Sequence, residues 1–576
     1  MTGLPRLGPW GPVAVPLALG AVLLLPRLGQ APIERAEVYF MDAARAMVEQ
    51  GDYLVPRYRH EPFYDKPPLT YWLMAGSFRL FGFGTGAARL VAVAAALGLL
   101  AVTARLGFLL FDRRTAAASA LVLATTVAFM TFGRVAMSDM LLALWTNLAL
   151  AVALAGWRPD PPRLFPAVLG AVLGLGFMTK GPVGVLFPGL GLLLLAAWRR
   201  AERPRLHASA VLAGASSFAV VGLSWFVAVL VREGPGPLVY FFLRENLERF
   251  AGEAYDAGRP WWFYIGAYLV VGLPWSPFLP AAAVRALRTP SAAPARFLLG
   301  WVALMLVPLS LSRGKIDYYL LPLYPAASLV VGRWLAGLPL ERRDRGAVRA
   351  ALLLLAAATA LAPLTVGRIP ERWLPGPWAH AAAAGAAATA ALALCAAALR
   401  PTPRRVLVTV AGTAAMLFLG AVLVFLPAFR DAQPNEAILA DVLRERRYRP
   451  DAAMVLCHDA PRVQRDILFH ARLAVEERCD VWAPASSRAP FLLLLQPEER
   501  QSLEAGPGFR VVSEHQALSG RDLTLRGLLR GPRPEGVVLA ANFDTDDPVA
   551  ETKRKKERKR ALRQAEEGDR EGSGGP

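Results

Sequence analysis

Long apolar runs alternate with short polar connections over most of the 576-residue chain. A helix of about 20 apolar residues is long enough to cross the hydrocarbon layer of a membrane, so the runs predict about thirteen membrane helices. The predicted helices lie near residues 11–27, 87–111, 115–133, 138–157, 164–179, 183–198, 208–232, 262–285, 296–311, 318–336, 350–366, 378–399 and 404–427. The first run follows Arg6 and resembles a signal peptide, but no clear small-residue cleavage site follows it. A retained anchor is therefore expected.

The polar connections fall into two classes that alternate along the chain. Connections of the first class are short and basic, as the cytoplasmic loops of membrane proteins are. They are residues 111–114, 158–163, 199–207, 285–296, 341–349 and 400–405. This alternation predicts that the N-terminus lies inside, and that the other connections and the region after residue 428 lie on the outer side of the cytoplasmic membrane.

Composition agrees with a multi-pass membrane protein. Hydrophobic residues make up 55% of the chain, and the mean hydropathy is +0.37. The formal net charge is +19, but most basic residues stand in the short loops between apolar runs. Such charge orients a protein in the membrane, and no nucleic acid partner is expected.

Three parts are predicted along the chain: a membrane domain over residues 1–430, an extracytoplasmic domain over 431–545 and a disordered charged tail over 546–576. The middle part alternates helical patterns with short apolar runs, which predicts a small α/β domain. The tail contains the run KRKKERKRALR.

Cys457 and Cys479 could form a disulfide if their domain is outside the cytoplasm, whereas Cys395 stands in an apolar run and is expected to face lipid or core.

The outer connections differ from the basic loops because they combine acidic, basic and aromatic residues. They comprise residues 31–68, the turn around Asp139, residues 179–182, the loop 233–261 and residues 312–319. Transporters more often place ionisable groups near the middle of the membrane. Charges at one face indicate chemistry on a substrate whose polar head lies at that face and whose tail lies in lipid.

Five motifs in these connections occur in the order found in one known family. They read AEVYF…GDYLVPRYRHEPFYDKPP (36–68), GRVAMSD (133–139), TKGPVG (179–184), RENLERF…RPWWFY (244–264) and KIDYYLLP (315–322). Over about residues 10–430 the chain resembles the aminoarabinose transferases and the bacterial relatives of the protein O-mannosyltransferases, which are integral-membrane glycosyltransferases of the GT-C class. The family's first acid is replaced by Ala36, its Arg-Tyr by Tyr39-Phe40, and a histidine before the aromatic run is absent.

The resemblance implies an all-α GT-C-like membrane fold with interfacial helices in the first outer loop. It implies a glycosyltransferase, inverting at the sugar, that moves a hexose or pentose from a polyprenyl-phosphate donor to a lipid, glycan or protein acceptor. Lipid A modification and protein O-glycosylation are reactions of this kind. Two alternatives remain at this stage: a transporter or flippase of polyprenyl-linked sugars, and a structural partner without activity.

Transfer from a lipid phosphate needs cations that stabilise the phosphate leaving group. Candidates are Lys66, Lys180, Arg313 and Lys315, with Tyr319 beside them, although lysines at helix ends also merely extend to the membrane surface. The resemblance adds further site residues, namely Asp42, Arg134, Glu245, Arg249 and Tyr264.

A hydroxyl acceptor also needs a carboxylate that removes its proton, whereas a phosphate acceptor does not. The candidates for this base are Glu37, Asp65 and Asp139, with Glu37 preferred between Glu37 and Asp139 because it keeps half of the acidic motif. Surface carboxylates are commonly only solvated. No cofactor is indicated with certainty; a divalent metal at Asp65 and Asp256 stays open, and His60 is a lone loop histidine without a spaced ligand cluster.

Overall fold

The computed structural model describes most of the membrane part and sections of the C-terminal part. Described are residues 11–431, apart from 32, 34, 59–60, 249, 251–258, 337–339, 368, 370–375 and 377, together with 435–448, 453–456, 475–477, 491–495, 510–517 and 535–541. The chain divides into two units, Met1–Arg430 and Asp431–Pro576. The predicted tail 546–576, Cys457 and Cys479 lie outside the described residues, and Cys395 is an exposed free cysteine.

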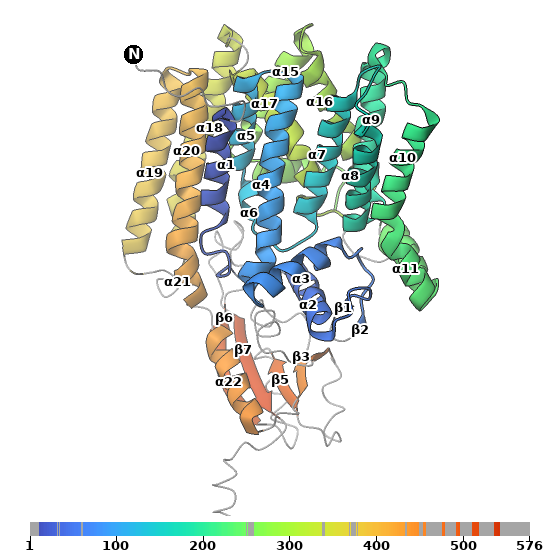
Figure 1. Ribbon diagram of the computed structural model, residues 1–576. Coiled ribbons are helices and arrows are strands. Elements are labelled where there is room, and N and C mark those ends of the chain that lie inside the picture. The colour runs from blue at the N-terminus through green and yellow to red at the C-terminus, as the bar shows by residue number, and fades with distance from the viewer. Residues whose placement is uncertain are drawn as a thin grey trace, which may run out of the picture. The chain divides into compact units, whose positions relative to one another are not determined.

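The first unit is a helix bundle, in agreement with the predicted fold class (Figure 1). Its first half contains α1 (Gly11–Leu24), α2 (Arg35–Gln50), α3 (Leu69–Phe81), α4 (Thr85–Leu110), α5 (Arg113–Ala124), α6 (Val127–Phe132), α7 (Asp139–Gly156), α8 (Phe165–Lys180), α9 (Val183–Trp198) and the short η1 (Arg200–Glu202). Then follow α10 (Ala208–Phe218), η2 (Ala219–Leu223), α11 (Ser224–Glu233), α12 (Gly236–Val239), η3 (Tyr240–Glu248), α14 (Phe263–Val271), η4 (Ser276–Phe278), α15 (Leu279–Arg288) and α16 (Ala293–Leu311). The last are η5 (Asp317–Leu323), α17 (Tyr324–Ala336), α18 (Arg342–Val366), α19 (Trp378–Leu399), α20 (Pro403–Gly420), η7 (Ala421–Phe425) and α21 (Leu426–Asp431).

Within the described residues, seven helices are long and apolar enough to cross a membrane, or eight if one bent pair counts as a span. Shorter apolar helices occur at Val13–Leu24, Phe165–Lys180 and Val183–Trp198. The protein is therefore a multi-pass membrane protein, but the predicted count of about thirteen spans is not confirmed. One reason is that several predicted spans are interrupted: 115–133 is two helices, and 262–285 bends by 117° between Val271 and Ser276.

Each of the two helix breaks supplies hydrogen-bond partners for the other. The backbone N–H of Val127, after the break between α5 and α6, donates to the carbonyl of Leu273 at 2.8 Å. The indole Nε1 of Trp275 donates to Thr125 Oγ1 at 3.0 Å. Non-helical backbone is tolerated at membrane depth only where protein groups replace the missing hydrogen bonds. These contacts supply such replacements, and hydropathy alone gave no sign of them.

The connections of each predicted class contact connections or helix ends of the same class. Basic loops contact one another or neighbouring helix ends, through Arg333–Asp112, Arg285–Glu341, Trp157 to the carbonyl of Arg199, and Arg205 to the carbonyl of Pro159. The connections of the second class meet likewise, through Lys66–Glu245 and Trp225 to the carbonyl of Leu54. In Figure 1, α15 lies near one end of the bundle, and α2, α3 and the hairpin β1 (Arg57–Tyr58) and β2 (Glu61–Pro62) lie at the other.

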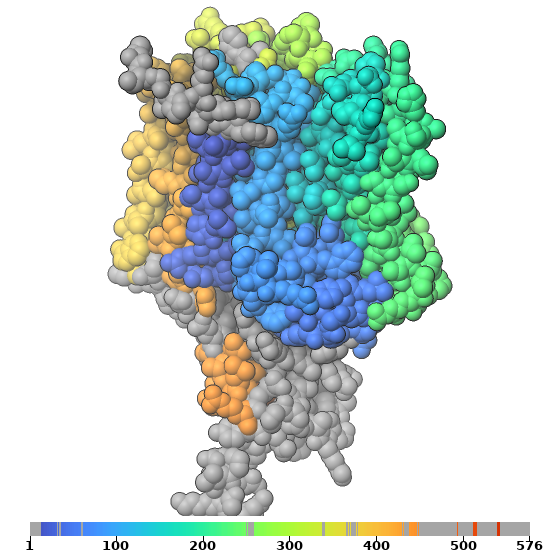
Figure 2. Space-filling model, in the orientation of Figure 1, coloured from blue at the N-terminus to red at the C-terminus, as the bar shows by residue number. Residues whose placement is uncertain are grey.

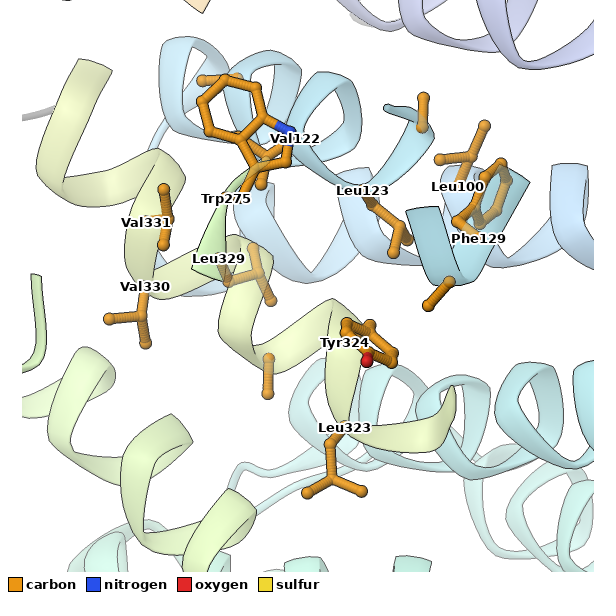
Figure 3. Close-up of a cluster of buried hydrophobic side chains, with 14 of the residues drawn as sticks. Leu100, Val122, Leu123, Phe129, Trp275, Leu323, Tyr324, Leu329, Val330 and Val331 are labelled. Atoms are coloured by element: carbon orange, nitrogen blue, oxygen red, sulfur yellow. The ribbon is translucent and has the colours of Figure 1, made fainter. Parts of the chain in front are cut away.

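The core of the bundle joins helices that are distant in sequence. Its almost fully buried residues include Leu100 of α4, Val122 of α5, Phe129 of α6, Leu323 of η5 and Leu329 of α17, which Figure 3 shows. Burying large aliphatic and aromatic side chains at native density fixes the relative positions of these helices. The rigid packing supports the connections at the end that bears the outer-loop motifs.

The connection 31–68, predicted to be the first outer loop, is folded rather than extended. It contains the predicted helix as α2, the short hairpin and then α3, which begins directly after the diproline 67–68. Proline suits the start of a helix, because its missing N–H would be unpaired there in any case. Figure 2 shows the side chains of this loop (blue) beside α11 (green), where the Arg232–Asp52 ion pair of 2.7 Å joins them.

The second unit contains the predicted mixed α/β elements. These are α22 (Asn435–Tyr448), β3 (Ala453–Leu456), β4 (Val475–Glu477), β5 (Phe491–Leu495), β6 (Arg510–Ala517) and β7 (Glu535–Ala541). The sheet order is β4-β3-β5-β7-β6, with β3 parallel to both neighbours and β7 antiparallel to both of its own. A small α/β domain is therefore confirmed.

Candidate functional site

A cavity of about 140 Å³ opens where the outer-loop motifs meet. Its polar wall holds Asp65 and Lys66 of the first loop, Lys180 at the end of α8, Glu245 and Asn246 of η3, and Tyr319 of η5. The remaining lining is mostly apolar and comes from α7, α9, η3, α16 and the segments that follow η3 and α16: Leu142, Val183, Leu186, Phe187, Phe241, Phe250, Pro308 and Leu309, with Ser312 and Gly314. The lining of the site thus combines charged and apolar side chains.

Lys66 joins the diproline turn to η3. Its Nζ donates to the carbonyl of Asp65 at 2.7 Å and forms an ion pair with Glu245 Oε2 at 3.1 Å. The hydroxyl of Tyr240 donates to Asp65 Oδ1 at 3.0 Å. The turn before α3 therefore holds Asp65 and Lys66 at the cavity wall, and η3 contacts both residues.

Lys180 also lines the cavity and forms a second ion pair. Its Nζ is 2.5 Å from Oδ1 of Asp139, the first residue of α7, and 4.5 Å from the ring centroid of Tyr319. A carboxylate in the first turn of a helix is stabilised by the helix dipole, and the Tyr319 ring favours a cation over its face. Three motifs that are far apart in sequence thus meet at Lys180.

Gly181 lets the chain turn directly after Lys180. Its φ is +67°, and a Cβ atom there would lie 2.5 Å from Cζ of Phe241, which lines the cavity. Only glycine tolerates both this conformation and this approach. The Thr-Lys-Gly-Pro motif is therefore also the surface against which η3 packs.

Gly181→Ala is expected to destabilise the fold by about 1–3 kcal/mol, the usual cost of a strained backbone conformation. It should also lower the rate of the reaction at this cavity by about ten- to a hundredfold, because the displacement of Phe241 disturbs the cavity. Thermal unfolding in detergent and the reaction rate measure the two effects. Gly189→Ala in α9 is the matched control, since nothing lies within 4 Å of its Cβ position. Equal behaviour of the two variants would contradict this account of the turn.

Glu37 is not at the cavity but in a fully buried ion pair. Its carboxylate accepts from Nε and Nη2 of Arg89, each at 2.8 Å, and from the backbone N–H of Ala136 at 2.7 Å. The exposed fractions are 0% for Glu37 and 1% for Arg89. The arrangement fixes α2, α4 and the segment before Asp139 relative to one another, so its geometry is that of a positioning residue.

The other predicted residues that the structure describes lie off the cavity wall. Arg134 donates to the carbonyls of Leu23, Leu24 and Pro26, and burial lowers its pKa to about 10. Asp42 pairs with Arg45 within α2, and Tyr264 is buried in the core.

Lys315 and Arg313 are in the connection between α16 and η5, but neither lines the cavity. The Lys315 ammonium donates to the carbonyl of Ser312, and burial lowers the pKa of this ammonium. The backbone N–H of Arg313 donates to the carbonyl of Phe250 at 3.3 Å. Of the predicted phosphate-binding residues, Lys66, Lys180 and Tyr319 are the ones at the cavity wall.

Arg249, Asp256 and His60 lie outside the described residues. Within the part of the chain that the structure describes, no group of three His, Cys, Asp or Glu residues could hold a metal ion.

Sequence reasoning missed Arg89, Tyr240 and Phe241. Arg89 could have been identified from the sequence, because a charged residue near the start of an apolar membrane helix requires a partner of opposite charge. Tyr240 and Phe241 belong to an aromatic run without a distinguishing pattern, so only the packing of η3 reveals their position.

Comparison with known proteins supports the motifs. Residues 65–225 match the family model of dolichyl-phosphate-mannose-protein mannosyltransferases. The undecaprenyl phosphate-alpha-4-amino-4-deoxy-L-arabinose arabinosyl transferase of Pseudomonas aeruginosa (strain UCBPP-PA14) is 34% identical over 355 residues, covering 59% of this chain and 63% of the relative. The enzyme of the same description from Pectobacterium carotovorum (strain PC1) is 30% identical over 336 residues, covering 57% and 60%. The chain thus matches less than two thirds of the length of these curated relatives.

Among solved structures, the crystal structure of ArnT from Cupriavidus metallidurans bound to undecaprenyl phosphate matches with a TM-score of 0.72. The match covers 93% of this chain and 98% of that one at 23% identity. At this identity the likeness shows the fold. The resemblance indicated by the five motifs is confirmed: the chain is similar in sequence to the aminoarabinose transferases and has their GT-C fold.

Proposed function

We propose that the protein is a membrane glycosyltransferase that takes a sugar from a polyprenyl-phosphate donor at the outer face of the cytoplasmic membrane. The observation that carries this proposal is the cavity whose lining combines Lys66 and Lys180 with aliphatic residues of α9 and α16. A polyprenyl-phosphate sugar has the matching chemistry, an anionic head joined to a long apolar tail. The donor named for the curated relatives is of this class.

In the proposed reaction an acceptor oxygen attacks the anomeric carbon from the side opposite the phosphate, which inverts that carbon. The bond between the anomeric carbon and the phosphate oxygen breaks, and its electron pair remains on the phosphate. Lys66 and Lys180 stabilise the developing charge, which is usually the largest contribution in such sites. The acceptor is a lipid, glycan or protein hydroxyl, whose proton passes to a carboxylate base as the new bond forms, and the sugar is a hexose or a pentose.

Purified protein in detergent should release free polyprenyl phosphate from polyprenyl-phosphate sugars when an acceptor extract is supplied. Mass spectrometry of the lipids measures both the released phosphate and the glycosylated product. A flippase would leave the donor intact and move it across vesicle bilayers instead. Movement without bond cleavage would overturn the proposal in favour of the transporter alternative. The described helix breaks at Thr125 and Leu273 give that alternative little support, since they contact each other and do not line the cavity.

Asp65 has the best position among the predicted bases, because it lines the cavity whereas Glu37 is bound to Arg89 and Asp139 to Lys180. Asp65→Asn is expected to lower the turnover of a hydroxyl acceptor by about 10²–10⁴-fold, with little change in donor KM. Steady-state kinetics with the natural acceptor measure this, with Asp139→Asn compared in parallel. Full turnover in Asp65→Asn would remove the base role from this residue and favour an acceptor that is already anionic.

A further inference from the structure

The contact between Lys66 and Glu245 lies inside the cavity and joins residues 179 positions apart. Glu245 is 5% exposed in its side chain and Lys66 19%, so the pair is largely shielded from water. The Glu245 oxygen at 3.1 Å and the carbonyl of Asp65 at 2.7 Å take two of the three N–H donors of this ammonium. Glu245 and a phosphate therefore compete for the same cation.

The charges of the cavity wall strengthen this competition. Two ammonium groups, Lys66 and Lys180, face two carboxylates, Asp65 and Glu245, and Lys180 is also paired with Asp139. Coulomb interactions are several times stronger in such a shielded site than in water. A phosphate placed beside Lys66 would be repelled by Glu245 in its present position, so each anion weakens the binding of the other to this ammonium.

The segment that bears Glu245 has a geometry suited to a change of position. η3 is a π-helical segment over Tyr240–Glu248, and π-helical turns are rare and occur frequently at functional sites. Asn246 donates to the carbonyl of Phe241 at 2.7 Å within this segment. A shift of η3 would move Glu245 while the diproline turn continues to hold Lys66.

We propose that Glu245 is an internal anion that holds Lys66 when no donor is bound and exchanges with the donor phosphate. This inference rests on the proposed function. The exchange lowers the affinity of the site for phosphate, because the Lys66–Glu245 ion pair must break before phosphate binds. It also promotes release of the polyprenyl-phosphate product, because the ion pair then forms again. Glu245 is thus a positioning residue that acts on the substrate through Lys66.

Glu245→Gln should bind polyprenyl phosphate about tenfold more tightly than the unchanged protein, within the usual range for coupled sites. Titration calorimetry of the full-length protein in detergent with a short-chain polyprenyl phosphate measures this. Steady-state kinetics should show a lower donor KM together with a lower kcat, since product leaves more slowly. Glu248→Gln is the matched control, because it removes the same charge from η3 at a residue that does not line the cavity, and its affinity should be unchanged.

A double-mutant cycle tests whether the gain in affinity of Glu245→Gln depends on Lys66. In a Lys66→Met background, Glu245→Gln should no longer raise affinity, whereas additive effects would contradict the exchange. A parallel titration with inorganic phosphate should rank the variants by affinity in the same order, if the phosphate group is what displaces Glu245. If the gain appears with the lipid but not with inorganic phosphate, the tail and not the cation causes it, and the inference fails.

Unchanged or weaker binding in Glu245→Gln, with normal thermal unfolding, would show that Glu245 merely orients Lys66 and would overturn the exchange. If that variant does not fold, Glu245→Asp serves instead, because its shorter side chain weakens the pair and should give a smaller gain in affinity. Failure of the unchanged protein to bind polyprenyl phosphate would contradict the proposed function itself, so the two failures are distinguishable.

Discussion

Lys66→Ala is expected to lower sugar transfer by on the order of a hundredfold or more, the loss typical when one preorganised group that stabilises transition-state charge is removed. The expectation rests on the position of Lys66 at the cavity wall, held by the carbonyl of Asp65 at 2.7 Å. The initial rate of polyprenyl-phosphate release measures the effect. The variant also leaves the carboxylate of Glu245, which is 5% exposed, without its ammonium partner, so thermal unfolding is measured in parallel and the rate is compared per folded protein.

Lys66→Arg and Lys315→Ala are the informative comparisons for this prediction. The arginine keeps the positive charge and should recover part of the rate. Lys315 was an equally strong candidate in the sequence, but it donates to the carbonyl of Ser312 within its own loop and does not line the cavity. Lys315→Ala is therefore expected to cost less rate than Lys66→Ala. Near-normal turnover in Lys66→Ala would remove this lysine from the mechanism.

Glu37→Gln is expected to lower the free energy of unfolding by about 3–5 kcal/mol, because it leaves the buried guanidinium of Arg89 without its ionised partner. Thermal or denaturant unfolding in a mild detergent measures the loss. The same variant should lose activity at assay temperature mainly through a smaller folded fraction and a displaced Asp139, since Glu37 accepts from Ala136 close to that residue.

A matched control is Glu341→Gln, whose carboxylate is 58% exposed in its pair with Arg285 and should contribute less than about 1 kcal/mol. The double variant Glu37→Gln with Arg89→Met should recover part of the stability, because both charges are then gone. If Glu37→Gln unfolds at the normal temperature but loses turnover with unchanged donor affinity, Glu37 is a base after all and the positioning role is wrong.

Much of the membrane architecture could be predicted from local pattern. Helices such as α4, α7, α16 and α19 lie where apolar runs predict them, within a few residues at each end. The helix α3 (Leu69–Phe81) was not among the predicted spans, although a diproline such as 67–68 suits the start of a helix. Hydropathy overlooked the breaks at Thr125–Thr126 and Gly272–Trp275, because their hydrogen-bond partners are supplied by segments about 150 residues away.

The candidate site was only partly predictable. Asp65, Lys66, Lys180, Glu245 and Tyr319 were all recognised by motif, and the structure brings them to one cavity. The same motifs gave equal weight to Glu37 and Lys315, which the structure places in other contacts. A motif reports which residues are near a site, but not which of them turn toward it.

By itself the sequence determined the positions of the apolar helices, the division of the connections into basic and mixed classes, and the residue types that gather at one end of the bundle. These depend on periodicity and composition within about 20 residues, which is the range over which a helix forms and spans a membrane. Only the tertiary structure decided which charge meets which: Lys66 with Glu245, Lys180 with Asp139, and Glu37 with Arg89. The energy of an ion pair depends on distance and shielding in three dimensions, and neither quantity can be read from spacing along the chain.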